Sequence, residues 1–545
     1  MSTQLTYFRP AQSEIPESTT MDFDAIVIGS GFGGAITACR LQEQGHKVLV
    51  LERGRRWDKK TFPRAPEDPW IWHNEARERL NGWAEVHAFK NMGVVTGAGV
   101  GGGSLIYANI SCEAHRDTFK RGWPAEISYE VLKPFYDRVG AFMNVGAIPD
   151  GQITARMQLM KEGANAIGAP ERYKKLQLAV SFDDQWTYAT DFERGEAASK
   201  IFKNQQGAEQ GTCVHLGRCD VGCDVLAKNT LDLNYLYWAE KKGTEVRPLH
   251  FVTNIEPLSQ GGYRVAFEEL KGGARHPGSA TAKLVIVAAG SIGSTELLLR
   301  CKLETKSLPK LSERLGYNWS SNGDFLTPAL QLGREVNPAV GPTIGSAIDF
   351  FEEGVEGGFW IEDGGFPALV SGLIDHRLDQ RDIGFKAKVI LKFMQKLLRQ
   401  KEAFRNVMPW FAQGVDAANG KLMLRQRSFL DKRLKLDLEW DIDRSREVMD
   451  KIVAMHVKLA RHTGGVPVVP PSWSIFKDLI TPHPLGGCNM GRDASQGVVD
   501  HAGQVFGYPG LYVADGAIIP EALGVNPSRT IGALAERIAM LIGAR

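Results

Sequence analysis

The stretch Asp24-Ala-Ile-Val-Ile-Gly-Ser-Gly-Phe-Gly-Gly34 decides the fold class. Residues 24–28 form an apolar, β-branched run that is typical of a buried parallel strand. Three spaced glycines follow directly, at Gly29, Gly31 and Gly34. Between a strand and a helix, glycines at this spacing allow a tight turn, close approach of the backbone to a pyrophosphate, and close helix packing. The stretch therefore predicts the phosphate-binding end of a dinucleotide site.

The residues that follow complete this unit. An apolar pattern predicts a helix over 33–44, whose N-terminal N–H groups would face the phosphates. A second apolar run predicts a strand over 47–51, which delivers Glu52 eighteen positions after Gly34. An acid at about this spacing binds an adenosine ribose and disfavours the 2′-phosphate of NADP. The residues expected to contact the cofactor here are Gly29, Gly31, Phe32, Gly33, Gly34, Glu52 and Arg53.

Length and composition restrict the class of protein. A chain of 545 residues is long enough for two or more domains. Its formal net charge of +2 gives no indication of a nucleic-acid partner, and no apolar run is long enough to span a bilayer. Residues 1–20 are polar and lack the charged-then-apolar pattern of a signal peptide. We therefore expect a flexible leader over 1–20 and a cytoplasmic protein.

The rest of the chain predicts two interleaved domains. A buried parallel strand over 284–289 runs into Gly290-Ser-Ile-Gly293, a second strand-to-glycine turn, and a final helix is expected over about 527–542. Strands are also expected near 245–249, 251–255 and 262–267. We assign residues 21–125, 205–303 and 478–545 to a discontinuous cofactor-binding domain, and residues 126–204 and 304–477 to a substrate-binding domain.

The seven cysteines do not suggest a disulfide framework. Cys213, Cys219 and Cys223 are clustered, with His215 among them. Their spacing fits neither paired C-x-x-C zinc modules nor ferredoxin runs. A glycine-rich structural loop with reduced thiols is favoured over a metal or iron–sulfur site, so no metal is expected.

One stretch, residues 382–405, is strongly basic. It contains seven lysines and arginines against one internal acid, Glu402, with apolar residues at near-helical spacing. A basic amphipathic helix can lie on an anionic membrane surface, although an ordinary surface helix with a solvated basic face is the commoner origin of this pattern. A peripheral membrane contact through this segment stays open, and it would suit an enzyme that collects a lipid substrate.

Two motifs near the C-terminus supply candidate catalytic residues. His483 lies in Thr481-Pro-His-Pro-Leu-Gly-Gly-Cys488, and histidine is the side chain best suited to proton transfer near neutral pH. Asn526 precedes Pro527, which fits the first position of the final helix. The alternatives are a buried, satisfied histidine and a plain helix N-cap. We predict that both residues meet a reacting hydroxyl group.

Taken in order, these motifs resemble the glucose–methanol–choline (GMC) family of FAD oxidoreductases, from about Asp22 to the C-terminus. Within that family they are most similar to the bacterial, intracellular cholesterol-oxidase-like branch, which shares the run Ala227 to Asp232. The motifs are Gly29–Gly34 with Glu52, Gly97-Ala-Gly-Val-Gly-Gly-Gly-Ser104, Gly122-Trp-Pro124, Val287–Ser294, His483–Cys488, Asp515-Gly516 and Asn526-Pro527.

The resemblance implies an α/β fold: a Rossmann-like, FAD-binding domain with a discontinuous α+β substrate-binding domain, which contains an antiparallel sheet and helices. It implies FAD as cofactor and His483 and Asn526 as catalytic residues. The further cofactor-binding residues that it implies are Gly97, Gly101, Gly102, Gly103, Ser104, Asn109, Val252, Ala289, Gly290, Asp515, Gly516, Asn526 and Pro527.

The implied activity is oxidation of an apolar secondary alcohol, such as a 3β-hydroxysteroid, by hydride transfer to the flavin, with O2 or another electron acceptor completing the cycle. The alternatives are a sugar, polyol or other alcohol as substrate, or a lyase that keeps FAD as a structural element. Secreted cholesterol oxidases have an asparagine where this chain has Tyr107, and for the glutamate that isomerises the steroid double bond the candidates are Glu362 and Glu402. If FAD is covalently bound, His73, His87 and His115 are the candidates, but free histidines are favoured.

Overall fold

The computed structural model describes residues 21–72, 82–351, 355–379, 384–398, 401–428 and 431–543. The leader predicted for 1–20 therefore lies outside the described residues. Within the described part of the chain, no helix is both long and apolar enough to cross a membrane.

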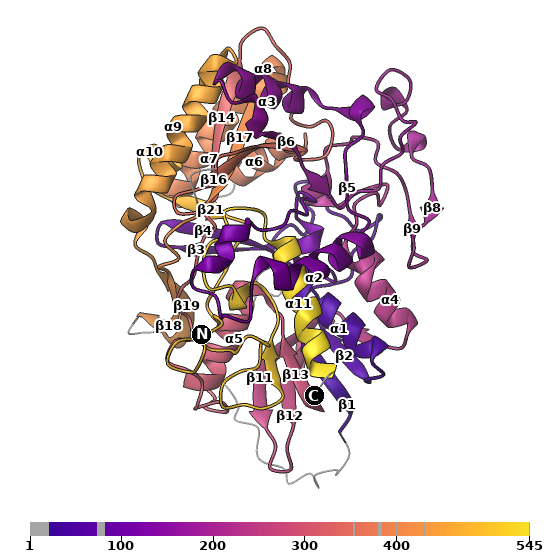
Figure 1. The fold of residues 1–545 in the computed structure, drawn as a ribbon, viewed down its shortest axis with the longest axis vertical. Coiled ribbons are helices and arrows are strands. Elements are labelled where there is room, and N and C mark those ends of the chain that lie inside the picture. The colour runs from indigo at the N-terminus through magenta and orange to yellow at the C-terminus, as the bar shows by residue number, and fades with distance from the viewer. Residues whose placement is uncertain are drawn as a thin grey trace.

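The N-terminal motif folds as the central strand of a seven-stranded sheet (Figure 1). Its strand order is β10-β2-β1-β13-β12-β11, and β22 also pairs with β13. The strands β10, β2, β1, the end of β13, and β22 are parallel, whereas β11, β12 and the start of β13 form an antiparallel meander. The Rossmann-like prediction is confirmed. The bounds are β1 Phe23–Ile28, β2 Val48–Leu51, β10 Glu245–Arg247, β11 His250–Pro257, β12 Tyr263–Lys271, β13 Ala274–Val287 and β22 Leu511–Val513.

Helices from distant parts of the chain pack beside this sheet. The glycine turn opens α1 (Phe32–Glu43), which contacts the last helix, α11 (Ser528–Gly543), and α4 (Tyr235–Lys241). The helix α2 (Tyr129–Phe142) packs on α11, although its residues fall in a segment that we assigned to the substrate-binding domain. The second glycine turn opens α5 (Gly290–Leu303), which lies against β11.

The second large sheet is antiparallel, in the order β20-β14-β17-β16-β15-β6. Two helices, α3 (Ala155–Ala166) and α9 (Arg446–His462), contact each other and pack on it. This sheet with its helices is the α+β part that the resemblance implied. The strand bounds are β6 Tyr173–Lys175, β14 Phe325–Gln331, β15 Ser346–Asp349, β16 Phe359–Asp363, β17 Val407–Gly414 and β20 Gly465–Pro467.

A small sheet, β21-β4-β3, joins the two halves of the molecule. The strand β4 (Met92–Gly97) ends at the second glycine-rich run, and β21 (Leu479–Thr481) ends two residues before His483. The sheet thus aligns the second glycine-rich loop with the loop that contains the candidate catalytic residue His483. The remaining elements are β3 Ala84–Phe89, β5 Gly146–Ala147, β7 Gln177–Leu178, β8 Phe202–Lys203, β9 Glu209–Gln210, β18 Lys421–Ser428, β19 Asp431–Glu439, α6 Val370–Asp379, α7 Phe385–Leu398, α8 Lys401–Asn406 and α10 Pro471–Ser474.

A buried ion pair fastens the helices of the cofactor half together. Glu536 of α11 is completely buried. Both of its carboxylate oxygens accept from Arg40 of α1, at 2.7–3.0 Å, and Oε1 also accepts from the Tyr235 hydroxyl of α4 at 2.8 Å. Three helices that are remote in sequence therefore meet at one carboxylate.

Replacing Glu536 by alanine should lower the free energy of unfolding by about 3–5 kcal/mol, because it leaves the Arg40 guanidinium buried without its main partner. Urea unfolding followed by tryptophan fluorescence measures this loss. Glu43→Ala is the matched control: Glu43 pairs with the same arginine but is about one-third exposed, so its loss should cost about 0.5 kcal/mol or less. Equal losses in the two variants would contradict the assignment.

Candidate active site

The two glycine-rich loops form a single cradle because their backbones touch. A Cβ atom at Gly33 would lie 1.8 Å from the carbonyl oxygen of Ala514. A Cβ atom at Gly102, which has a φ of +52°, would lie 2.5 Å from the Cα atom of Gly31. Side chains at these positions would force the loops apart. The cradle predicted from Gly29–Gly34 and Gly97–Ser104 is thus brought together with the segment around Asp515.

Several charged or polar residues of the cradle form hydrogen bonds and ion pairs with the protein that hold the loops of the cradle in place. Glu52 accepts from the backbone N–H and the hydroxyl of Ser30, at 3.1 and 2.6 Å, and from the backbone N–H of Gly54 at 2.8 Å. Burial raises the pKa of Glu52, and these hydrogen bonds oppose the shift. Arg53 is paired with Glu85, and Ser104 donates to the Gly101 carbonyl at 2.7 Å.

Asp515 connects the two later cofactor segments. Its Oδ2 atom accepts from the Gly290 N–H at 2.8 Å and from the Ser294 hydroxyl at 2.5 Å, and Oδ1 accepts from the Ala517 N–H at 2.8 Å. The carboxylate thereby fixes the start of α5, with Ala289 and Gly290, against Gly516. Val252, another predicted cofactor-binding residue, lies on β11 of the seven-stranded sheet, next to a β-bulge.

Asn109 shows that the cradle fits a bound group. Its backbone has a φ of +68°, and both polar atoms of its buried amide lack a protein partner. Such an amide is costly to bury unless a ligand or water satisfies it. The hydroxyl of Ser528 donates to the Ile110 carbonyl at 2.9 Å, so Asn109 lies beside the start of α11, which follows Asn526 and Pro527. A dinucleotide cradle with an unpartnered amide at this end fits FAD.

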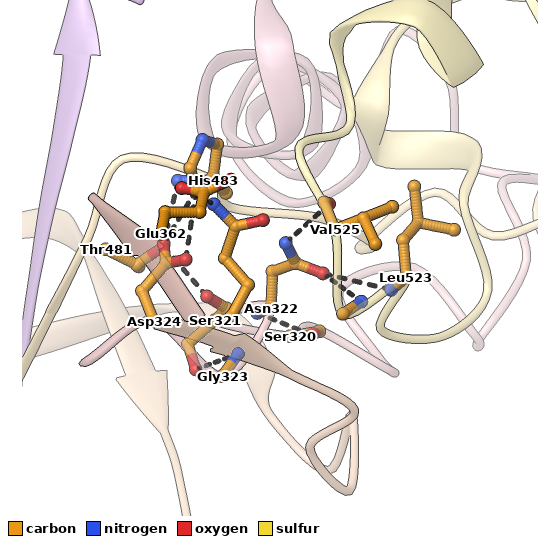
Figure 2. Close-up of polar contacts among 12 residues, drawn as sticks. Ser320, Ser321, Asn322, Gly323, Asp324, Glu362, Thr481, His483, Leu523 and Val525 are labelled. Atoms are coloured by element: carbon orange, nitrogen blue, oxygen red, sulfur yellow. Dashed lines mark hydrogen bonds and ion pairs between the residues drawn. The ribbon is translucent and has the colours of Figure 1, made fainter. Parts of the chain in front are cut away.

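The catalytic candidate His483 is held by a buried carboxylate (Figure 2). Its Nδ1 atom lies 2.9 and 3.0 Å from the two carboxylate oxygens of Asp324, which is 1% exposed. The Thr481 hydroxyl lies 2.5 Å from Asp324 Oδ2 and accepts from the backbone N–H of His483 at 2.8 Å. Because Asp324 occupies Nδ1, the proton-accepting position left on the imidazole is Nε2.

The same loop, residues 320–324, also positions Asn526. Asn322 accepts from the backbone N–H groups of Leu523 and Gly524, at 3.0 and 2.8 Å, and donates to the Val525 carbonyl at 3.0 Å. Asn526 follows directly, buried, with its Oδ1 atom unpartnered. One short loop therefore holds His483 on one side and the segment leading to Asn526 on the other.

Glu362, one of the two candidate glutamates, lies in this site. It is fully buried on β16, its Oε2 atom accepts from Gln413 at 3.3 Å, and it has a side-chain hydrogen bond with Asn526. Its Oε1 atom has no partner. Burial, and then the nearby carboxylates of Asp324 and Asp363, raise the pKa of Glu362 well above its ordinary value. The side chain of the other candidate, Glu402, lies outside the described residues.

An aromatic face adjoins these polar groups. In the second sheet Glu362 is paired across strands with Phe411, whose ring centroid lies 6.3 Å from that of His483. Trp360 is paired with Gln413 and donates to it at 3.2 Å. The sheet therefore presents alternating aromatic and polar side chains beside His483, the candidate catalytic histidine.

The sequence offered no sign of Asp324 or Asn322 as functional residues, because neither belongs to a local motif. The quoted run Ala227 to Asp232 now has a role: its Leu231 N–H donates to Ser104 at 3.0 Å, and Tyr107 donates to the Asn229 carbonyl at 2.8 Å. The run braces the second glycine-rich loop, and Tyr107 braces the run.

The structure also describes the surroundings of the clustered cysteines and of His215, which lies among them in the sequence. All seven cysteines are free, and no group of three or more His, Cys, Asp or Glu side chains in the described ranges is placed to hold a metal ion. His215 is buried, stacks on Trp186, and lies 2.9 Å from the Tyr188 hydroxyl; burial lowers its pKa to about 3. His73 lies outside the described residues.

The fold and the site define an FAD-dependent oxidoreductase that acts on alcohols. Family models described as GMC oxidoreductase match residues 23–320 and 416–535, and the chain belongs to that family. It is 29% identical to a cholesterol oxidase of Acinetobacter baumannii, with 96% of this chain and 95% of the relative covered. It is 30% identical to a cholesterol oxidase of Mycobacterium tuberculosis, with 95% and 91% covered. Pyridoxine 4-oxidase from Mesorbium loti shares the fold, at 14% identity, a TM-score of 0.60 and coverage of 96% and 99%.

The contact between Asp324 and His483 predicts a dependence on the carboxylate. Asp324→Asn should lower the turnover of alcohol by about 100-fold or more and shift its pH profile, because the imidazole loses the charge that stabilises its protonated form. Steady-state assays from acidic to alkaline pH, on protein of equal FAD content, measure both effects.

Asp416→Asn is the matched control. Asp416 is a buried acid that accepts from Ser320 and Ser321 of the same loop, but not from His483. Its replacement should weaken the fold while leaving the pH profile in place. If the two variants change the profile alike, Asp324 acts only as a support of the loop.

Proposed function

We propose that this protein oxidises an apolar secondary alcohol to the ketone, and that its substrate is a 3β-hydroxysteroid such as cholesterol. The observation that carries the proposal is the placement of His483, Asn526 and Glu362 around one point, beside the aromatic face of Trp360 and Phe411. The similarity over nearly the whole chain to two relatives named cholesterol oxidase supports it.

The alcohol must lose a hydroxyl proton and a hydrogen from its carbon. His483 accepts the hydroxyl proton at Nε2, while Asp324 stabilises the imidazolium from the Nδ1 side. Asn526 donates from its amide Nδ2 to the hydroxyl oxygen, and its otherwise unpartnered Oδ1 atom is left to accept from the cofactor edge. When bound in the cradle, FAD supplies the acceptor for the hydride, and O2 or another acceptor takes the electrons onward.

The side chains beside His483 favour an apolar substrate over a sugar. Phe411 is half-buried, and Trp360 has its one polar atom committed to Gln413. A sugar would require a hydrogen-bonding partner for each hydroxyl group, since buried polar groups left unpaired are costly. The unpartnered polar atoms in this region, on Glu362 and Asn526, suit one hydroxyl group rather than several.

Anaerobic titration with cholesterol in detergent tests the proposal. The oxidised flavin absorption should bleach with the wild-type protein, and His483→Gln should bleach about 100-fold more slowly, because it lacks the proton acceptor. The rate at which the absorption recovers in air distinguishes an oxidase from a dehydrogenase.

Sugars, polyols and simple alcohols are the comparison substrates in the same experiment. Bleaching by these and not by steroids would move the substrate elsewhere in the family. A protein that holds oxidised FAD and bleaches with none of them would favour the lyase alternative, in which FAD has a structural role.

Glu362 favours a second activity on the same substrate, isomerisation of the steroid double bond. A buried carboxylate with a raised pKa is a stronger base, and its unpartnered Oε1 atom is able to take a proton from the carbon beside the ketone and return it to the far carbon of the double bond. The electrons shift within the steroid, so no oxidant is needed.

Glu362→Gln should therefore keep alcohol oxidation within about tenfold and release the unconjugated ketone in place of the conjugated one. Glutamine preserves the size of the side chain and its contact with Asn526. Chromatography with absorption at the wavelength of the conjugated ketone measures the product. Equal amounts of conjugated ketone from the variant and the wild type would rule Glu362 out as the proton carrier.

A further inference from the structure

The basic amphipathic helix predicted within 382–405 is present as α7, but its apolar side is already used. Leu391, Met394 and Leu397 pack with the buried side chains of Ile374 in α6 and Val407 in β17. The apolar periodicity of this helix is therefore explained by packing within the protein. Any contact with a membrane has to come from the side of α7 that stays exposed.

That exposed side combines one aromatic residue with three lysines. Phe385 is 76% exposed, the largest exposed fraction of any large hydrophobic side chain that the structure describes. Lys388, Lys392 and Lys396 are exposed and follow at intervals of three and four residues, so all four side chains lie along one face of the helix. We call Lys388, Lys392 and Lys396 the lysine stripe.

The start of α7 lies against the segment that leads into the catalytic loop. Lys386 forms an ion pair with Asp478 at 3.2 Å and lies 5.4 Å from the centre of the Phe476 ring. Ile475, in the same segment, is 65% exposed. Two large apolar side chains, Phe385 and Ile475, thus stand in water on neighbouring segments.

The small sheet β21-β4-β3 continues this surface. Ile480 of β21 and Ala88 of β3 are both paired with Gly93 of β4, and Val86 is two residues along the same face of β3. Ile480 and Val86 are 56% and 49% exposed. In Figure 1, α10, β21, β4 and β3 follow one another down one side of the molecule. The four exposed large apolar side chains therefore belong to neighbouring elements: α7, the segment between α10 and β21, β21 itself, and β3.

The charges around these apolar side chains are mainly positive. Exposed Lys90 stands at the turn between β3 and β4, and the lysine stripe runs along α7. Of the nearby acids, Asp478 is paired with Lys386 and Glu85 with Arg53, while Asp375 of α6 accepts from Gln395. Exposed apolar side chains bordered by lysines match the interface of a membrane that contains anionic lipids.

We propose that Phe385, Ile475, Ile480 and Val86, together with the lysine stripe, form a face that binds an anionic lipid surface. The inference rests on the proposed function in one respect: an apolar alcohol is dissolved in membranes, and this face borders the site. Ile480 is next to Thr481, whose hydroxyl contacts Asp324, and is three residues from His483. Binding at this face would bring the catalytic loop to the lipid that contains the substrate.

Sedimentation of the FAD-loaded, full-length protein with steroid-free vesicles tests the proposal independently of turnover. Binding should be strong to phosphatidylcholine mixed with phosphatidylglycerol, weak to phosphatidylcholine alone, and reduced by added salt. The variant Lys388→Gln, Lys392→Gln, Lys396→Gln should bind the mixed vesicles roughly 100-fold more weakly. The variant Phe385→Ser, Ile475→Ser should bind them at least about tenfold more weakly.

The matched control is Ile201→Ser, Met540→Ser. These side chains are 70% and 44% exposed, and they belong to the segment before β8 and to α11, which Figure 1 shows away from α10, β21, β4 and β3. The control should bind vesicles as the wild type does. Equal weakening in the two serine variants, or wild-type binding that ignores phosphatidylglycerol, would overturn the proposal.

Two further measurements separate the remaining outcomes. Light scattering that shows a dimer, dissociated by Phe385→Ser, Ile475→Ser, would overturn the proposal by assigning the face to a second copy of the chain. Flavin bleaching by detergent-dissolved cholesterol should be unchanged in this variant, because detergent delivers the steroid without a membrane. If cholesterol in detergent does not bleach the flavin of the wild-type protein, but the protein still binds vesicles, the proposed substrate is wrong. The lipid-binding face would then remain supported.

Discussion

The buried contact between Asp324 and His483 is the constraint on which the active site depends. Asp324 stands at the start of a strand of the antiparallel sheet, whereas His483 follows a strand of the small sheet that also carries a cofactor loop. The contact therefore locks the two halves of the molecule together at the reacting atoms. Asn322, two residues earlier, makes the second connection, to the segment before Asn526. A loop of five residues fixes the relative position of both candidate catalytic side chains.

The buried acids near His483 differ in how completely the protein satisfies their hydrogen bonds. This difference indicates where a ligand would bind. Asp416 accepts from two serines and from backbone N–H groups, and Asp363 is paired with Arg156 and accepts from Gly345 and Ser346. Both carboxylates are satisfied by the protein. Glu362 has only two amide partners and one unpartnered oxygen, so of these three acids it has the greatest need for another polar group. Glu362, the acid that we propose to be functional, is thus distinguished from the other two by its partners and not by its burial.

The sequence predicted those parts of the structure that are determined by residues close together in the chain. The glycine turn at Gly29–Gly34 is predictable because backbone contact with neighbouring segments requires glycine there. The second turn is predictable because Gly290 has a φ of +81°, a conformation that favours glycine. His483 and Asn526 were predicted as candidates because each lies in a run that contains proline and glycine. Asp324 could not be found this way: its partner is 159 residues away, and an acid at the start of a strand has no distinctive pattern. Glu362 was named as a candidate, but only the pairing of β16 with β17 places it beside His483.

The helix α7 was predicted correctly from the sequence, but the sequence pattern does not identify what its apolar stripe contacts. An apolar stripe on a basic helix arises equally from packing in a core and from contact with lipid, since both environments exclude water. Packing against Ile374 and Val407 accounts for that stripe. What packing does not account for is Phe385, which is exposed at the start of the helix, where Lys386 contacts the segment that contains exposed Ile475 and Ile480. Burial of these side chains would release ordered water, and the lysine stripe would restrict that burial to anionic surfaces.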